Sequence, residues 1–79
     1  MTNQQLKKEI QEFWEETIKY GETGYPSETL AFAYMLGMPP NECERMFFEE
    51  LCYWEKEDIA LYNRVVTLIN QVRKEKGGN

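Results

Sequence analysis

The sequence predicts an all-α fold, a small bundle of three helices organised around a long C-terminal helix, with a fourth helix if that last one is broken. Three observations support this prediction. First, the stretch from Asn41 to Glu75 contains neither Gly nor Pro, the residues that most reliably interrupt a helix. Second, that stretch carries an apolar stripe at helical spacing, formed by Cys43, Phe47, Leu51, Trp54, Leu61, Tyr62, Val65, Leu68, Ile69 and Val72. Third, 42% hydrophobic and 14% aromatic residues suffice for a core in a single domain of 79 residues.

The first helix is predicted from about Asn3 to Tyr20, with Thr2 or Asn3 as its N-cap. Apolar side chains recur along one side of it, at Leu6, Ile10, Phe13, Trp14, Thr17 and Tyr20. Charged residues occupy the other side, which is typical of a solvated helix face. Gly21 follows the last turn, where a left-handed backbone is least costly for glycine, so we expect the helix to end there.

The second helix is predicted over about residues 27–36. The segment GETGYPSE before it holds two glycines and a proline, so we expect a connector, with the proline in the first helical turn or Ser27 as the cap. Leu30 to Leu36 is apolar without interruption, and its composition favours a helix over a strand that would lack a pairing partner. Gly37 and the pair Pro39-Pro40 are expected to end this helix.

The third helix is predicted over about residues 42–74, followed by a frayed tail at 75–79. Asn41 is its expected N-cap, and Glu44 three residues later completes a capping box. Asp58 poses a difficulty, because on an unbroken helix its carboxylate would enter the apolar stripe, where it is expensive without a partner. A break near residues 56–58, with Asp58 capping a fourth helix, would remove that difficulty. The stripe keeps its phase across this point, which favours a continuous helix with a kink.

Charge and cysteine content narrow the functional classes. The formal net charge is −5, and no apolar run is long enough to span a bilayer, so we expect no membrane partner. Two cysteines and the absence of a recognisable signal peptide indicate a reducing compartment, which predicts a cytoplasmic protein. Acidic residues concentrate in 41–58 and basic residues in 59–79, and part of this asymmetry is ordinary stabilisation of helix dipoles.

A helix-turn-helix is one functional hypothesis for the second and third helices. The sequence resembles Cro-like units in having a small residue, a turn glycine and flanking core hydrophobes, at Ala33, Gly37, Met38, Cys43 and Met46. The resemblance implies a DNA-binding regulator, with phosphate contacts from the basic tail at Arg73, Lys74 and Lys76. The helix that would enter the groove is acidic, however, at Glu42, Glu44, Glu49 and Glu50. Because carboxylates oppose phosphate contact, direct nucleic-acid binding is the alternative and not the leading prediction.

A Mg²⁺ site is another hypothesis. Glu12, Glu15 and Glu16, with Glu55 and Asp58 later, resemble the acidic pairs of MazG-type nucleotide pyrophosphohydrolases, which hold Mg²⁺ between facing helices. The first cluster has the order ExxEE, whereas that family has EExxE. The chain also has no histidine, which excludes an imidazole base and any Ser-His or Cys-His pair. We therefore expect a protein that is not an enzyme and that needs neither metal nor cofactor.

The leading hypothesis is a protein-binding face on the C-terminal helix. A second apolar row lies away from the main stripe, at Phe48, Cys52, Ile59 and Val66, and with Trp14 and Tyr53 it exceeds what so small a core needs. The alternative is that the first two helices cover both rows. We predict a partner-binding surface of apolar residues with an acidic rim, formed by Phe48, Tyr53, Ile59, Val66, Glu42, Glu49, Glu50, Glu55 and Glu57.

This surface suggests what kind of protein the chain is. We expect a small acidic, non-catalytic adaptor or inhibitor of a cellular protein, by analogy with the acidic proteins that phages and mobile elements encode against host factors. The acidic rim predicts a basic partner, including a nucleic-acid-binding protein whose basic groove it would occupy. A homodimer that uses the same apolar surface as its seam is the other partner the pattern allows.

Overall fold

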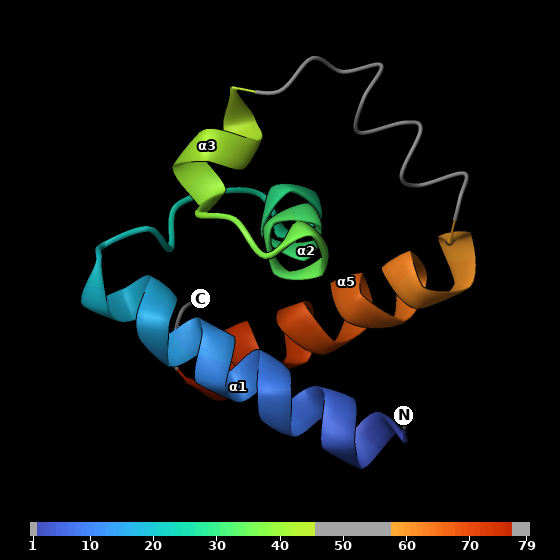
Figure 1. The fold of residues 1–79 in the computed structure, drawn as a ribbon. Coiled ribbons are helices and arrows are strands. Elements are labelled where there is room, and N and C mark those ends of the chain that lie inside the picture. Colours follow the sequence, from blue (N-terminus) through green and yellow to red (C-terminus); the bar gives the residue numbers. More distant parts are fainter. Residues whose placement is uncertain (1, 46–57, 77–79) are drawn as a thin grey trace.

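The computed structural model describes residues 2–45 and 58–76, and within these ranges the chain forms four α-helices and no strand (Figure 1). They are α1 (Asn3–Lys19), α2 (Ser27–Leu36), α3 (Pro40–Glu44) and α5 (Ile59–Glu75). The predicted all-α class is confirmed. The bounds of α1 and α2 also agree with the prediction, to within one residue at each end.

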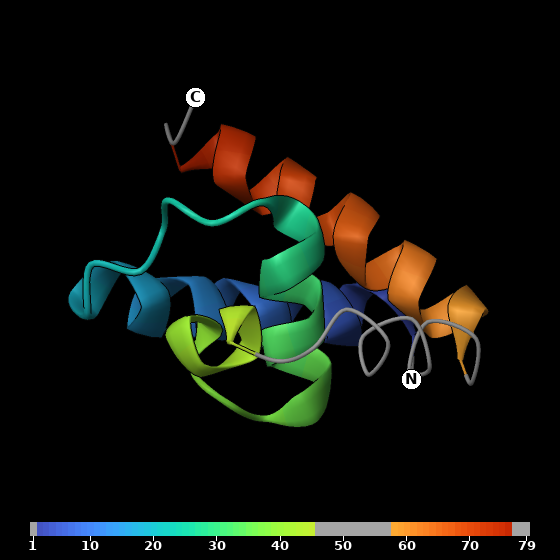
Figure 2. The ribbon, with the colours of Figure 1, turned by 90° about the horizontal axis from the view of Figure 1, so that it is seen from above.

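Helix α5 is the element against which the others are arranged. It packs against both α1 and α2, and α3 packs against α2. Figures 1 and 2 show that α1 and α5 begin at the same end of the molecule and run in the same general direction, while α2 crosses them. The connector between α1 and α2 therefore spans the end of the molecule at which α5 finishes.

Local hydrogen bonds fix both ends of α1. Thr2 is the N-cap of a capping box: the backbone N–H of Gln5 donates to Thr2 Oγ1 at 3.2 Å, and the N–H of Thr2 donates to Gln5 Oε1 at 2.9 Å. At the other end Gly21 has φ of 70°, the left-handed conformation expected there. The backbone N–H of Glu22 then donates to the carbonyl of Thr17 at 2.8 Å, which folds the chain back over the last turn of α1.

A left-handed glycine also ends α2. Gly37 has φ of 69°, and the N–H groups of Gly37 and Met38 both donate to the carbonyl of Ala33, at 3.0 and 3.1 Å. Helix α3 then starts two residues earlier than predicted: Pro39 is its N-cap and Asn41 lies inside it, so the predicted Asn41–Glu44 capping box is wrong. Pro40 accounts for this start, because its fixed φ suits the first helical position and it has no N–H to satisfy.

The continuous helix favoured for residues 42–74 is wrong. Helix α3 ends at Glu44, and a new helix begins at Ile59 with Asp58 as its N-cap. Asp58 Oδ1 accepts a hydrogen bond from the backbone N–H of Leu61 at 3.2 Å, and its φ and ψ of −146° and 65° are not helical. The alternative, in which Asp58 caps a further helix, is thus confirmed, and the cap keeps the carboxylate exposed instead of in the apolar stripe.

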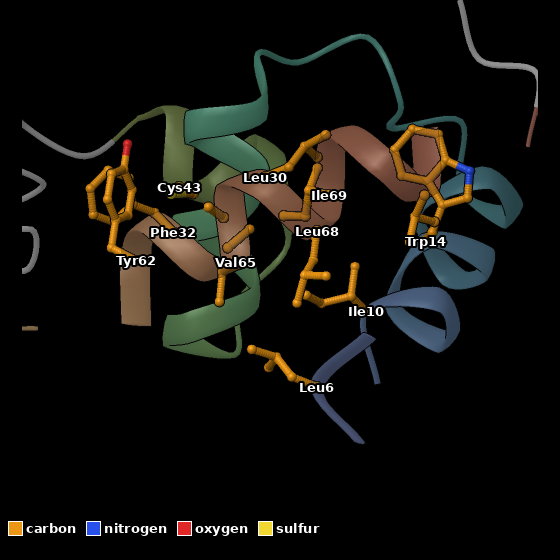
Figure 3. Close-up of a cluster of buried hydrophobic side chains, with 13 residues drawn as sticks. Leu6, Ile10, Trp14, Leu30, Phe32, Cys43, Tyr62, Val65, Leu68 and Ile69 are labelled. Carbon is orange, nitrogen blue, oxygen red and sulfur yellow. The ribbon is translucent and has the colours of Figure 1, made fainter. Parts of the chain in front are cut away.

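The core lies where α1, α2 and α5 meet (Figure 3). Its fully or nearly fully buried hydrophobic residues are Leu6, Ile10, Trp14, Leu30, Ala31, Phe32, Ala33, Cys43, Tyr62, Val65, Leu68, Ile69 and Val72. Phe32 of α2 and Tyr62 of α5 stack with ring centroids 4.7 Å apart. The buried residues of α5 all belong to the stripe that predicted this helix, whereas Phe47, Leu51 and Trp54 of that stripe lie outside the described residues.

Arg73 near the end of α5 holds the α1–α2 connector against the helices. Its guanidinium donates to the backbone carbonyl of Thr23 at 2.7 Å, to the carbonyl of Tyr25, and to Ser27 Oγ at 3.1 Å. It also lies over the ring of Trp14, 5.5 Å from the centroid. One side chain therefore joins α5, α1 and the start of α2, and it orders the chain next to the site described below.

Candidate protein-binding site

Three members of the predicted partner-binding surface lie within the described residues. Ile59, the first residue of α5, is 45% exposed, whereas Val66, two turns further along the same helix, is half-buried and packs against the core. Glu42 is exposed on α3, a helix that packs against α2. Six predicted members lie outside the described residues: Phe48, Glu49, Glu50, Tyr53, Glu55 and Glu57.

The structure has the corner between α2 and α3 that a helix-turn-helix needs, but α3 is short for a recognition helix. Ala33 and Cys43 are buried where α2 and α3 meet, and burial raises the pKa of the Cys43 thiol, which therefore acts as a small core residue. Helix α3 spans 5 residues, and its exposed side chains are those of Glu42 and Glu44. Met46, the last residue of the Cro-like pattern, lies outside the described residues.

The acidic residues proposed for Mg²⁺ do not form a coordination set in the part of the chain that the structure describes. In residues 2–45 and 58–76, no three His, Cys, Asp or Glu side chains gather closely enough to hold a metal ion. Glu15 instead pairs with Lys76 of α5 at 3.0 Å, and Asp58 serves as a helix cap. Glu55 lies outside the described residues.

A small apolar pocket, which the sequence did not reveal, lies between the C-terminal half of α1 and the α2–α3 turn. Figures 1 and 2 show α3 next to that half of α1, with the turn passing to one side of it. The pocket has a volume of about 180 Å³ and is lined by Phe13, Glu16, Thr17, Tyr20, Glu22, Met38, Pro39 and Pro40. Its walls are therefore two aromatic rings, a methionine and a pair of prolines, with two carboxylates among them.

Contacts within the fold hold several walls of the pocket. Phe13 is held by an edge-on contact with Tyr34 of α2, with ring centroids 5.7 Å apart. Thr17 donates its hydroxyl to the carbonyl of Phe13 at 2.8 Å, so its methyl group remains for the pocket. Gly21 returns Glu22 over the end of α1, and Gly37 directs Met38 and the prolines towards it. These contacts thus hold Phe13, Thr17 and the two glycine turns beside the pocket in place.

Carboxylates surround the pocket. Glu16 and Glu22 belong to its described lining, and a shallow groove further along α1 adds Glu9 and Glu12, beside Gln5 and Lys8. Burial raises the pKa of Tyr25, the carboxylates of Glu44 and Glu22 raise it further, and the charge of Arg45 lowers it. A cation, Lys19, lies beside Tyr20, with its ammonium 5.7 Å from the centre of the ring.

Tyr34 of α2 contacts α1 next to the pocket. Its hydroxyl donates to Glu9 Oε1 at 3.1 Å. Partial burial, this hydrogen bond and the charge of Glu9 raise the pKa of Tyr34 to about 12. Phe13, Tyr34 and Glu9 are therefore one connected unit that supports the pocket wall from the α2 side.

Three residues of this pocket stood out in the sequence, but their role depends on the tertiary structure. Phe13, Thr17 and Tyr20 recur at helical spacing and were assigned to the core face of the first helix. The structure splits that face: Thr17 is buried, Phe13 is half-buried, and Tyr20 is 68% exposed. The row next to Leu6, Ile10 and Trp14 therefore borders the core and lines a pocket.

Comparison of the chain with protein-family models, with curated proteins and with solved structures gives no match. None of the helices in the described ranges has the length and the apolar composition that crossing a bilayer requires. The chemistry of the surface itself is thus the basis on which function is proposed.

Proposed function

We propose that the protein is a small, acidic, non-catalytic protein-binding module, an adaptor or inhibitor that acts in the cytoplasm. The observation that carries the proposal is Ile59, a large aliphatic side chain left 45% exposed at the first position of α5. Asp58 and Ala60 beside it are exposed as well, and Val66 continues the apolar row along the helix. Covering one such isoleucine at an interface contributes up to about 2 kcal/mol.

The charge of the chain supports a basic partner. The net charge of −5 and the acidic residues predicted around Ile59 would speed encounter with a basic protein and disfavour acidic ones. A nucleic-acid-binding protein is one partner class with that property. A second copy of this chain is less favoured, because two acidic rims would face each other across a symmetric seam.

The experiment compares two isoleucines of nearly equal exposure on different helices. Ile59 is 45% exposed on α5, and Ile18 is 47% exposed on α1. The wild-type chain, Ile59→Asp and Ile18→Asp are immobilised, partners are captured from a lysate of the source cells, and recovery is quantified by mass spectrometry. We expect Ile59→Asp to lose a specific partner that Ile18→Asp retains, with equal helix content by circular dichroism. Equal recovery by both variants would contradict the proposal.

A helix-turn-helix regulator is the second candidate, and the observation that favours it is the α2–α3 corner, closed by Gly37 in the left-handed conformation. Its phosphate contacts would come from Lys74, and from Lys76 once it leaves its ion pair with Glu15, since the guanidinium of Arg73 already binds the α1–α2 connector. A gel-shift assay with duplex DNA over a salt series separates the two functions. Affinity that falls steeply with salt would favour the regulator.

A further inference from the structure

We propose that the pocket formed by Phe13, Thr17, Tyr20, Met38 and the two prolines binds one apolar side chain of a peptide segment that carries lysine or arginine beside it. This inference rests on the proposed function in taking the ligand to be a protein. However, the pocket is a second contact surface, and it lies far from Ile59. Figures 1 and 2 place the start of α5 at one end of the molecule and the C-terminal half of α1 at the other.

The size of the pocket selects a single side chain. Sites for complete small molecules usually have volumes of about 300–1,000 Å³, whereas an apolar cavity of about 150 Å³ accepts one benzene ring. At about 180 Å³ this pocket matches a phenyl or branched aliphatic group and is too small for a nucleotide or a similar metabolite. A protein segment delivers such a group together with backbone and neighbouring side chains that bind outside the pocket.

The surroundings of the pocket select basic neighbours for that side chain. Glu16 and Glu22 are the charged residues of its described lining, and Glu12 lies one turn before Glu16 on α1. A lysine or arginine on either side of the anchoring group would thus meet a carboxylate. Tyr20 offers a further contact, because its exposed ring already accepts the ammonium of Lys19 on its face.

The rigidity of the site favours binding. Prolines 39 and 40 have fixed φ angles, and Phe13 is supported by Tyr34 and, through Tyr34, by Glu9. Little conformational entropy is then lost when a ligand enters, which matters for a contact that buries only one side chain. The expected affinity of the pocket alone is weak, so the test needs a method that detects millimolar binding.

The test uses the full chain, labelled with ¹⁵N, and four acetylated and amidated heptapeptides. One has a central phenylalanine flanked by lysines, and a second has a central leucine with the same flanks. The third replaces the central residue with glycine, and the fourth replaces the lysines with glutamates. We expect saturable amide shift changes at Phe13, Thr17, Tyr20 and Met38 with the first two peptides and none with the other two.

Variants with matched charge changes complete the test. Glu16→Lys and Glu22→Lys should each weaken binding of the phenylalanine–lysine peptide about fivefold, the equivalent of about 1 kcal/mol. Glu28→Lys makes the same change in charge at an exposed position of α2 outside the pocket lining, so its affinity should match that of wild type. Tyr20→Ala should weaken binding, whereas Ile18→Ala, another exposed apolar position of α1, should not.

Three results would overturn the inference. They are the absence of saturable shifts with either lysine peptide, equal affinities for Glu16→Lys and Glu28→Lys, and shifts centred on Ile59 and Ala60 instead of the pocket. The last result would leave the protein-binding function standing and move all of it to α5. The opposite outcome is also informative. If the pocket binds the lysine peptides but Ile59→Asp does not affect the captured partner, the surface proposed at Ile59 is contradicted and the pocket inference stands.

Discussion

Arg73 shows how a single side chain near the end of the chain positions a connector far from it in sequence. Its guanidinium donates to two backbone carbonyls and to one hydroxyl of residues 23–27, and its plane lies over Trp14. Trp14 is 3% exposed, and its indole Nε1 has no hydrogen-bond partner within the described residues. The Trp14 ring therefore meets a polar group through its face, at the Arg73 guanidinium, and not through its N–H.

Substitution of Arg73 should lower stability more than its half-buried position suggests. Arg73→Ala removes hydrogen bonds from a charged donor to two carbonyls, so the free energy of unfolding should fall by about 2–3 kcal/mol. Arg73→Lys should recover only part of this loss, because a lysine ammonium cannot reach all three acceptors as the guanidinium does. Urea denaturation provides the measurement, and Lys74→Ala, an exposed neighbour, should stay within about 0.5 kcal/mol of wild type. Equal effects at positions 73 and 74 would contradict this role.

Tyr34 gives the fold a defined dependence on alkaline pH. Its folded pKa of about 12 lies above the usual value of 10.0, so the folded state holds the phenolic proton more tightly than the unfolded chain does. The stabilising contribution is complete below about pH 10 and is lost as the pH rises from there through about 12. An ultraviolet titration should show a tyrosine component near pH 12 that is lost in Tyr34→Phe and persists in Tyr20→Phe and Tyr25→Phe. A component that survives in Tyr34→Phe would assign it to another residue.

Among the elements, α1 and α2 were predicted almost to the residue because their signals are local. A capping threonine, glycines that adopt positive φ and an apolar period each act within a few residues. The last predicted helix failed for the opposite reason. The apolar stripe was taken to outweigh one carboxylate, whereas Asp58 gains a hydrogen bond by capping and avoids burial. The phase of a stripe does not require one unbroken helix when two helices can present it to the same core.

Asp58 should therefore behave as an N-cap when it is changed. Asp58→Ala removes the acceptor for the N–H of Leu61 and should lower the free energy of unfolding by about 1 kcal/mol. Asp58→Asn keeps an acceptor of similar geometry and should retain most of the stability. Thermal unfolding followed by circular dichroism measures both. If alanine and asparagine proved equally destabilising, charge and not capping would account for the residue.

The candidate site could be predicted only in part. Ile59 stands out in the sequence because its row departs from the main stripe, and the structure leaves it exposed. The pocket could not be derived, because it exists only when the α2–α3 turn lies beside the C-terminal half of α1. Met38, Pro39 and Pro40 are 18–27 residues from Phe13 and Tyr20 along the chain, and local pattern does not say which elements will meet. In the sequence Met38 belonged to the Cro-like pattern, and Pro39 and Pro40 predicted the end of a helix.

At the scale of the whole molecule, the two proposed contact surfaces lie at opposite ends of a small bundle whose centre is occupied by core. Each consists of apolar side chains near carboxylates: Ile59 beside Asp58 at one end, and the pocket beside Glu16 and Glu22 at the other. A chain of 79 residues has little room for more than one hydrophobic core. The contacts proposed for a partner are therefore the apolar groups outside that core that lie beside carboxylates, at Ile59 and in the pocket.

The central claim is that the exposed apolar side chain at the start of α5 contacts a partner protein. The most direct measurement is the dissociation constant of the captured partner for Ile59→Asp relative to Ile18→Asp, by titration calorimetry on variants of equal helix content. The account predicts at least a tenfold weakening for Ile59→Asp, about 1.4 kcal/mol or more, and no change for Ile18→Asp. Equal dissociation constants for the two variants would contradict it.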